Sequence, residues 1–169
     1  MTPAETIVSE SDASAGVGGQ YLSFTLGGED YGVDILRVQE IKGWETVRPL
    51  PDTPDYVKGV LDLRGKIVPI IDLRTRLKLD HAEYTPTTVT IVLTVESESG
   101  PNFVGIVVDG VSDVLDVPGD DVRAAPDLGA HINTKYITGM VIQGERMVVL
   151  LDVDRLFNPD ELGLPVNVG

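Results

Sequence analysis

Two apolar runs separated by a charged turn, between Gly59 and Leu73, form the most pronounced hydrophobic pattern in the chain. The second run is rich in β-branched residues, and together the runs predict a buried β-hairpin. Gly65 supplies the positive φ that a tight turn requires, so the hairpin should hold Arg64 at a rigid, solvent-facing tip. Pro69 has no backbone N–H, and we therefore expect the returning strand to lie at a sheet edge or at a bulge.

The same pattern returns eighty positions later, over residues 136–153. A second alignment places residues 31–41 over residues 104–114. The chain therefore predicts two similar units, about residues 20–85 and 86–158, either intertwined or adjacent, each ending in such a hairpin. The aligned pairs of the hairpin repeat are Tyr56 with Tyr136, Gly59 with Gly139, Ile67 with Met147, and Asp72 with Asp152.

Short strands account for most of the remaining pattern. Apolar and polar residues alternate over residues 21–34 around a glycine-rich turn, which predicts another hairpin. β-Branched runs predict further strands over residues 87–95 and 102–117. Many short strands without a long amphipathic helix predict an all-β fold, mainly β with short helices and organised in barrels.

Three aspartates are placed to begin short helical segments. Asp34 precedes residues 35–41, whose apolar side chains recur every three positions, and this spacing favours a short helix or an irregular turn over a strand. Asp72 and Asp152 occupy the same place at the ends of the two repeated hairpins, where each is expected to cap a short helix.

Composition and charge limit the partners of the chain. Its 169 residues, 42% of them hydrophobic, suffice for one domain or two small ones. A net charge of −14 and a pI near 4.3 argue against nucleic acid and anionic lipid as direct partners. The sequence has no cysteine, no apolar run of about 20 residues and no signal pattern, so we expect a cytoplasmic protein without membrane insertion. Residues 1–19 and 159–169 are expected to form flexible tails.

Residues suited to catalysis do not form a recognised pattern. His81 and His131 lack metal-site spacing, and no G-x-S-x-G nucleophile motif is present, so we expect no metal, no cofactor and no catalytic residue. Two aspartates facing each other would instead form the acid pair of a carboxylate-dependent hydrolase, which is the alternative from another functional class. The candidates for such a pair are Asp34, Asp72, Asp109 and Asp152.

Apolar residues in equivalent places of the two units are candidates for a binding surface. Val38 and Ile41 of the first unit correspond to Val111 and Val114 of the second. Two barrels side by side leave a groove, and a partner helix can insert apolar side chains into such a groove. The alternative is that all four residues belong to the core.

Charged and aromatic candidates are fewer. Glu40 and Arg64 have opposite charges and can form an ion pair, which if exposed contributes only about 0–1 kcal/mol to stability. A solvated arginine at the turn is the alternative. Trp44, the only tryptophan, is suited either to cover a core or to anchor an interface.

Several ordered motifs between residues 20 and 157 lie in the hairpins and connections described above. They include Tyr31-Gly32-Val33-Asp34-Ile35, Val38-Gln39-Glu40-Ile41, Lys58-Gly59-Val60, Leu63-Arg64-Gly65, and the runs 67–74 and 104–115. Together these motifs resemble the CheW family of chemotaxis coupling proteins. The residue before the Leu-Arg-Gly tip departs from the family pattern, because Asp62 stands where family members often have Asn.

The resemblance implies a non-enzymatic adaptor of two SH3-like five-stranded β-barrels side by side. Such proteins couple the cytoplasmic tips of chemoreceptors to the regulatory domain of the histidine kinase CheA, at receptor arrays on the inner face of the membrane. We expect the isolated chain to be a monomer, and a coupling protein of another array, such as one for surface motility, is the alternative in this class.

The resemblance also implies roles for single residues. The receptor tip should dock at the groove, and the kinase should bind at a barrel end, where Glu40 paired with Arg64 orients the surface. The implied receptor-binding residues are Ile35, Val38, Ile41, Val111 and Val114. The implied kinase-binding residues are Gly59, Arg64 and Gly65.

Overall fold

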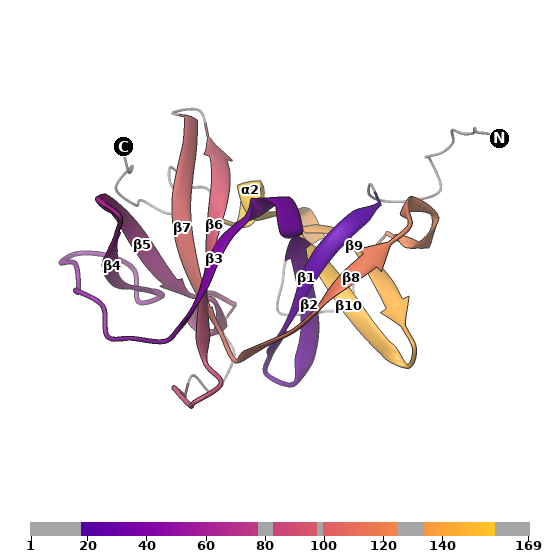
Figure 1. Ribbon diagram of the computed structural model, residues 1–169, viewed down its shortest axis with the longest axis horizontal. Coiled ribbons are helices and arrows are strands. Elements are labelled where there is room, and N and C mark those ends of the chain that lie inside the picture. Colours follow the sequence, from indigo (N-terminus) through magenta and orange to yellow (C-terminus); the bar gives the residue numbers. More distant parts are fainter. Residues whose placement is uncertain (1–17, 78–82, 98–99, 125–133, 158–169) are drawn as a thin grey trace.

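The computed structural model describes residues 18–77, 83–97, 100–124 and 134–157, and these contain two five-stranded sheets (Figure 1). One sheet has the strand order β8-β1-β2-β10-β9 and the other the order β3-β6-β7-β5-β4. The strands are β1 (Gly19–Leu26), β2 (Glu29–Asp34), β3 (Val38–Gly43), β4 (Val57–Leu63), β5 (Lys66–Asp72), β6 (Val89–Ser97), β7 (Gly100–Val108), β8 (Gly110–Val117), β9 (Ile137–Gln143) and β10 (Arg146–Leu151). The helices are the short α1 (Leu73–Arg76) and α2 (Val153–Leu156) and the 3-10 helices η2 (Ile35–Arg37), η3 (Gly119–Asp121) and η4 (Thr134–Tyr136).

Each sheet curls around an apolar cluster of its own. Val117 of β8 and Val141 of β9 lie in one buried cluster although they come from opposite edges of their sheet. In the other sheet, Leu63 of edge strand β4 and Trp44, just after edge strand β3, share a second cluster. We call the first the terminal barrel (β1, β2, β8, β9, β10) and the second the central barrel (β3 to β7). The predicted fold class, mainly β in two five-stranded barrels, is confirmed.

The largest apolar cluster lies between the barrels and takes side chains from both. Phe24 on β1 of the terminal barrel and Leu93 on β6 of the central barrel both belong to it, and both are fully buried. Fully burying a side chain of this kind contributes about 1.5–3 kcal/mol. This inter-barrel cluster therefore makes the two barrels one folded body.

The two sequence units contribute strands to both barrels. In the terminal barrel, β1 pairs with β8 and β2 with β10, and β8 to β10 come from the second unit. In the central barrel, β6 pairs with β3 and β7 with β5, and β3 to β5 come from the first. If five is added to each strand number, with β1 counted after β10, one sheet order becomes the other. The boundary expected near residue 85 thus does not coincide with the boundary between the barrels.

Pro69 lies in an interior strand, so the edge position is wrong, but the alternative, a bulge, is present next to it, where the register of β4 on β5 shifts between Val57 and Gly59. β5 is flanked by β4 and β7. Pro69 lies opposite Val60, whose backbone groups bond to Arg48 on the far side of β4, so no hydrogen bond between Val60 and Pro69 is lost. On the other side, the pairing of β5 with β7 begins only at Ile70. Proline is tolerated because neither neighbouring strand requires its N–H.

The predicted caps are confirmed, whereas the helix over residues 35–41 is only partly so. The carboxylates of Asp34, Asp72 and Asp152 accept the backbone N–H groups that begin η2, α1 and α2. The 3-10 helix η2 ends at Arg37, and β3 begins at Val38. Among the described residues, no helix is long and apolar enough to cross a membrane. His81, His131 and nearly all of the two predicted tails lie outside the described residues.

Candidate functional site

Apolar side chains of β3 and β8 border the inter-barrel cluster. Val38 on β3 and Val111 on β8 are half-buried and pack against this cluster, as does Ile35 on η2. β3 belongs to the central barrel and β8 to the terminal barrel. The two aligned valines of the repeat therefore contact the same core from different barrels.

A bulge in each of these strands explains the spacing of three that resembles a helix. Val38 and Ile41 lie opposite Leu93 and Ile91 of β6, which both face the inter-barrel cluster, because the register shifts between Val38 and Glu40. Directly opposed residues share a face of a sheet, so Val38 and Ile41 also share one. Without the shift, residues three apart would face opposite sides.

The equivalent shift is present in the terminal barrel. Val111 and Val114 lie opposite Phe24 and Leu22 of β1, and both of these face the inter-barrel cluster. The Ser23 hydroxyl fills the irregular step, donating to the Asp113 carbonyl at 3.0 Å and accepting from the Asp113 N–H at 3.1 Å. Val111 and Val114 therefore face the same side.

Exposure divides this surface into an inner and an outer part. Ile41 and Val114 are 44% and 51% exposed, whereas Val38 and Val111 are half-buried. Leu36 on η2 is 82% exposed. The sequence does not distinguish it from the other apolar residues of this short segment. We call Ile35, Val38, Ile41, Val111 and Val114 the inter-barrel surface.

The β4–β5 hairpin holds a charged tip, as predicted. Arg64 and Gly65 both have positive φ, 54° and 86°, which forms the tight turn. The Gly65 N–H donates to Asp62 Oδ1 at 3.0 Å. An asparagine side-chain oxygen can accept the same bond, so Asp62 preserves the turn despite its added charge.

Glu40 and Arg64 form the expected ion pair. Arg64 NH2 lies 3.1 Å from Glu40 Oε1, with the Arg64 side chain 81% exposed and that of Glu40 25% exposed. Glu40 lies opposite Val92, which faces the interior of the central barrel. It therefore projects from the face of β3 opposite to Val38 and Ile41.

Gly59 is buried, and its conformation allows a close contact with a neighbouring segment. It has φ of 148°, and a Cβ at this position would lie 2.1 Å from the Arg48 carbonyl oxygen. Arg48 and Val60 exchange two backbone hydrogen bonds of 3.1 and 2.8 Å, which hold the segment before β4 against that strand. Gly59 makes this close approach possible.

Trp44 covers the interior of the central barrel. It packs against the cluster that contains Leu63 and Val107, and it stacks on Tyr84 with ring centroids 4.3 Å apart and planes 4° apart. Of the two sequence interpretations, the structure favours the core.

The four candidate aspartates do not form an acid pair. Asp34 and Asp152 cap helices. Asp72 and Asp109 approach each other, but the Arg74 guanidinium lies between them and bonds to both. The guanidinium thus occupies the space between the two carboxylates that a scissile bond would need. Within the described part of the chain, no three His, Asp or Glu side chains gather as a metal ion requires.

Two five-stranded sheets, each curled around an apolar cluster and joined through a shared core, define a protein of the double β-barrel class. Comparison with known proteins identifies the family. The CheW-like domain family matches residues 20–161. A chemotaxis protein CheW of Klebsiella aerogenes is 48% identical over 152 residues, which cover 90% of this chain and 89% of that protein. A CheW of Rhizobium meliloti is 36% identical over 144 residues, covering 85% and 90%.

A solved structure agrees with these sequences. The scaffolding protein TtCheW of Thermoanaerobacter tengcongensis superposes with a TM-score of 0.75 at 25% identity, covering 84% of this chain and 94% of that one. The chain belongs to the CheW family. The family expected from the sequence, and with it a non-enzymatic coupling protein of chemotaxis, is thereby confirmed.

Proposed function

We propose that this chain binds the cytoplasmic tip of a chemoreceptor at the inter-barrel surface and the regulatory domain of the kinase CheA at the β4–β5 tip. It acts in the cytoplasm, at receptor arrays on the inner face of the membrane. The single observation that carries this proposal is the two-sided character of β3. One face of the strand bears Val38 and Ile41, and the other bears Glu40, paired with Arg64.

The inter-barrel surface suits a helical partner. It offers apolar side chains from two barrels, of which Ile41 and Val114 are already accessible. A helix that inserts apolar side chains three and four residues apart matches such a pair of apolar strips. The protein is acidic overall, so apolar contact rather than charge supplies the attraction to an uncharged or acidic helix.

The β4–β5 tip suits a polar partner surface. Arg64 has a positive φ on a two-residue turn, and its side chain pairs with Glu40. Little conformational freedom of this side chain is therefore lost when a partner protein binds it. Gly65 has open space where a side chain would be, which allows a partner to approach the backbone. Gly59 is buried, and its part in kinase binding is to let the segment at Arg48 lie flat on β4.

Reconstitution tests the proposal as a whole. Purified receptor and kinase are combined with and without this chain, and we expect kinase output to follow receptor ligand only when the chain is present. Receptors and kinases of a chemotaxis array and of a surface-motility array, compared in parallel, identify the array served. Kinase output that is the same with and without the chain in both arrays would contradict the proposal.

The inter-barrel surface is tested by Ile41→Asp combined with Val114→Asp. Both positions are exposed, so we expect the free energy of unfolding to change by no more than about 0.5 kcal/mol per position. Receptor affinity, measured by co-sedimentation with receptor arrays, should fall at least about ten-fold. Val38 is less suitable because it packs against the core. Ile142→Asp, at an apolar residue 54% exposed on β9, is the matched control and should bind normally.

The β4–β5 tip is tested by Arg64→Glu. The change reverses the exposed charge and places it beside Glu40, so kinase affinity should fall about ten-fold while receptor affinity stays within about two-fold. Isothermal titration with the kinase regulatory domain measures the first. Arg155→Glu, at a residue whose side chain is 67% exposed, makes the same charge change elsewhere. Equal loss of both partners by the tip variant would refute the assignment.

A further inference from the structure

Two ion pairs occupy the crossovers where the chain passes from one barrel to the other. The first crossover is η2, between β2 of the terminal barrel and β3 of the central barrel, and it carries Arg37. The second is Asp109, which lies between β7 of the central barrel and β8 of the terminal barrel. Arg37 pairs with Asp154 on α2, and Asp109 pairs with Arg74 on α1. We call these the crossover ion pairs.

The first crossover ion pair joins three elements. Arg37 donates two parallel hydrogen bonds to the Asp154 carboxylate, at 2.7 and 2.6 Å, and a third to the Thr94 carbonyl at 3.1 Å. Asp154 Oδ1 also accepts the Glu96 N–H at 2.8 Å. The hydrogen bonds to Asp154 raise the pKa of Arg37 above its ordinary value. Because α2 follows the terminal barrel and β6 belongs to the central one, the pair ties both barrels to η2.

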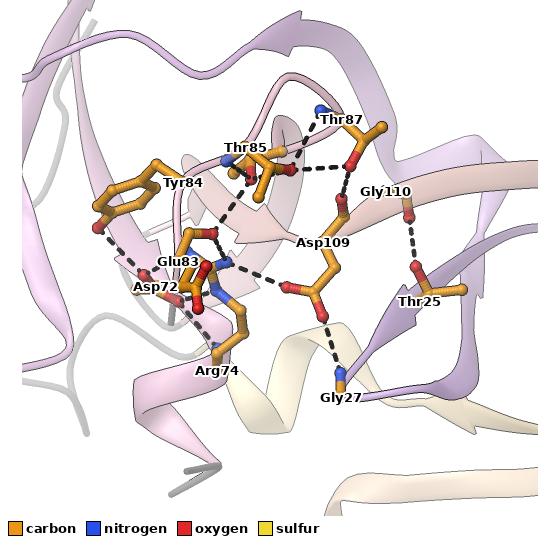
Figure 2. A network of polar contacts seen from close by, with 11 residues as sticks. Thr25, Gly27, Asp72, Arg74, Glu83, Tyr84, Thr85, Thr87, Asp109 and Gly110 are labelled. Carbon is orange, nitrogen blue, oxygen red and sulfur yellow. Dashed lines mark hydrogen bonds and ion pairs between the residues drawn. The ribbon is translucent and has the colours of Figure 1, made fainter. Parts of the chain in front are cut away.

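The second crossover ion pair joins a buried arginine to a partly exposed aspartate, and Figure 2 shows its contacts. The Arg74 side chain is 1% exposed and bonds to both oxygens of Asp72 at 2.9 Å, to Asp109 Oδ1 at 3.0 Å and to the Glu83 carbonyl at 2.6 Å. The other oxygen of Asp109 accepts the Gly27 N–H at 2.8 Å. Gly27 lies in the β1–β2 turn of the terminal barrel, and α1 follows the central barrel. Asp109 therefore bonds to both barrels at once.

The internal repeat relates the two pairs with opposite polarity. Arg74 and Asp154 stand at equivalent positions of the two units, two residues after the helix caps Asp72 and Asp152. The helix supplies the cation in one pair and the anion in the other. The apolar cluster between the barrels is not directional, so it holds the barrels together without setting their angle. Hydrogen bonds of defined geometry on both sides do set it.

We infer that the crossover ion pairs fix the angle between the two barrels and are thereby positioning residues for coupling, a role that rests on the proposed function. Both strands of the inter-barrel surface start directly after a crossover. Val38 follows Arg37, and β8 begins at the residue after Asp109. Loss of the pairs therefore releases the start of β3 and the start of β8, which bear the receptor-binding residues, without changing any of those residues.

The angle is measured by pulsed electron paramagnetic resonance on the full chain. The chain has no cysteine, so Ile67→Cys on β5 and Asp116→Cys on β8 place one spin label on each barrel. Both positions are exposed, and their cross-strand partners, Asp62 and Gln20, take no part in the crossover ion pairs. We expect one narrow distance distribution, which becomes at least about two-fold wider in Asp109→Asn/Asp154→Asn. Asparagine keeps an acceptor for the Gly27 and Glu96 N–H groups, so the helices and turns are retained.

Matched controls separate this effect from general charge loss. Asp120→Asn and Arg155→Gln remove exposed charges from η3 and α2 and should leave the distribution unchanged. If the double variant does not fold, Asp154→Asn alone, at the pair whose arginine is partly exposed, should still broaden the distribution. An unchanged distribution in a folded variant, with the controls also unchanged, would overturn the inference.

Coupling provides the second readout. In the double variant, receptor affinity and receptor control of kinase output should each fall about ten-fold, because the receptor-binding residues lie on both barrels. Binding to the kinase alone should stay within about two-fold, because the β4–β5 tip lies on one barrel. Full coupling despite a broadened distribution would overturn the positioning role and leave the proposed function intact. If the double variant broadens the distance distribution but the unaltered protein does not couple receptor to kinase, the proposed function would be overturned. The role of the ion pairs in fixing the angle would still hold.

Discussion

Tyr31 shows at the scale of one residue how the inter-barrel cluster controls a titratable group. Its ring is 3% exposed and stacks on Phe24 with centroids 6.0 Å apart, and its hydroxyl donates to Glu29 Oε1 at 3.3 Å. Burial first, and then the negative charge of Glu29, raise the pKa of Tyr31 to about 12. The ordinary value for tyrosine is about 10.

This shift predicts a loss of stability at alkaline pH. Below pH 10 both folded and unfolded chains keep the phenol proton, so the stabilisation is fully present. Between pH 10 and 12 only the unfolded chain ionises, and the free energy of unfolding should fall by about 2–3 kcal/mol through this group. Urea unfolding of the native chain and of Tyr31→Phe at several pH values measures it. The other titrating groups are common to both chains, so parallel pH profiles would contradict the assignment.

At the scale of elements, the capped helices α1 and α2 offer a comparison within one molecule. Asp72 and Asp152 occupy equivalent positions, and each accepts the backbone N–H two residues further on. Their backbone N–H groups donate to the carbonyls of Tyr56 and Tyr136, both at 2.8 Å. They differ most in burial, because Asp72 is fully buried and pairs with buried Arg74, whereas Asp152 is partly exposed and pairs with exposed Arg155.

Alanine at each cap should therefore have unequal effects. Asp152→Ala removes a helix cap and should lower the free energy of unfolding by about 1 kcal/mol. Asp72→Ala also deprives a buried guanidinium of its main partner and should cost about 3–5 kcal/mol. Urea unfolding of both variants tests this, and Asp72→Asn, which keeps the cap but not the charge, should fall between them. Equal losses at the two sites would show that the buried pair adds nothing.

Local signals in the sequence predicted these elements well. The hairpins, the positive φ of Gly65 and the three aspartate caps depend on residues a few positions apart, and all are present in the structure. The error at Pro69 and the strand that replaced a helix at Val38 have another origin. Both depend on which strand lies alongside, and pairing partners such as β5 with β7 are set by contacts distant in the chain.

The candidate site was predicted to a similar extent. The Glu40–Arg64 pair and the shared apolar border at Val38 and Val111 were anticipated from the repeat and the family resemblance. The crossover ion pairs were not, because Arg37 and Asp154 are 117 positions apart and no local pattern joins them. The burial of Gly59 has no local sequence signal either, because it depends on the segment at Arg48, which covers this residue.

For the whole molecule, the distribution of strands predicts how it folds. Each sequence unit holds two strands of one barrel and three of the other, so neither can complete a sheet by itself. Fragments 1–82 and 83–169 should each fail to give a folded monomer, since their unpaired strand edges and apolar faces would be exposed. Mixed in equal amounts, they should recover the β-sheet circular dichroism and elute together as a single complex. Cooperative unfolding of either fragment as a monomer would disprove this.

The exchange of strands between the units also bears on the origin of the chain. A half-length ancestor carrying one unit would have closed its barrels only by trading strands with a second copy of itself, as in a domain-swapped homodimer. Gene duplication and fusion would then have made that obligatory partnership permanent. It would also have freed the two halves to diverge, so that one hairpin now carries Arg64 and its duplicate carries Gly144 at the corresponding place.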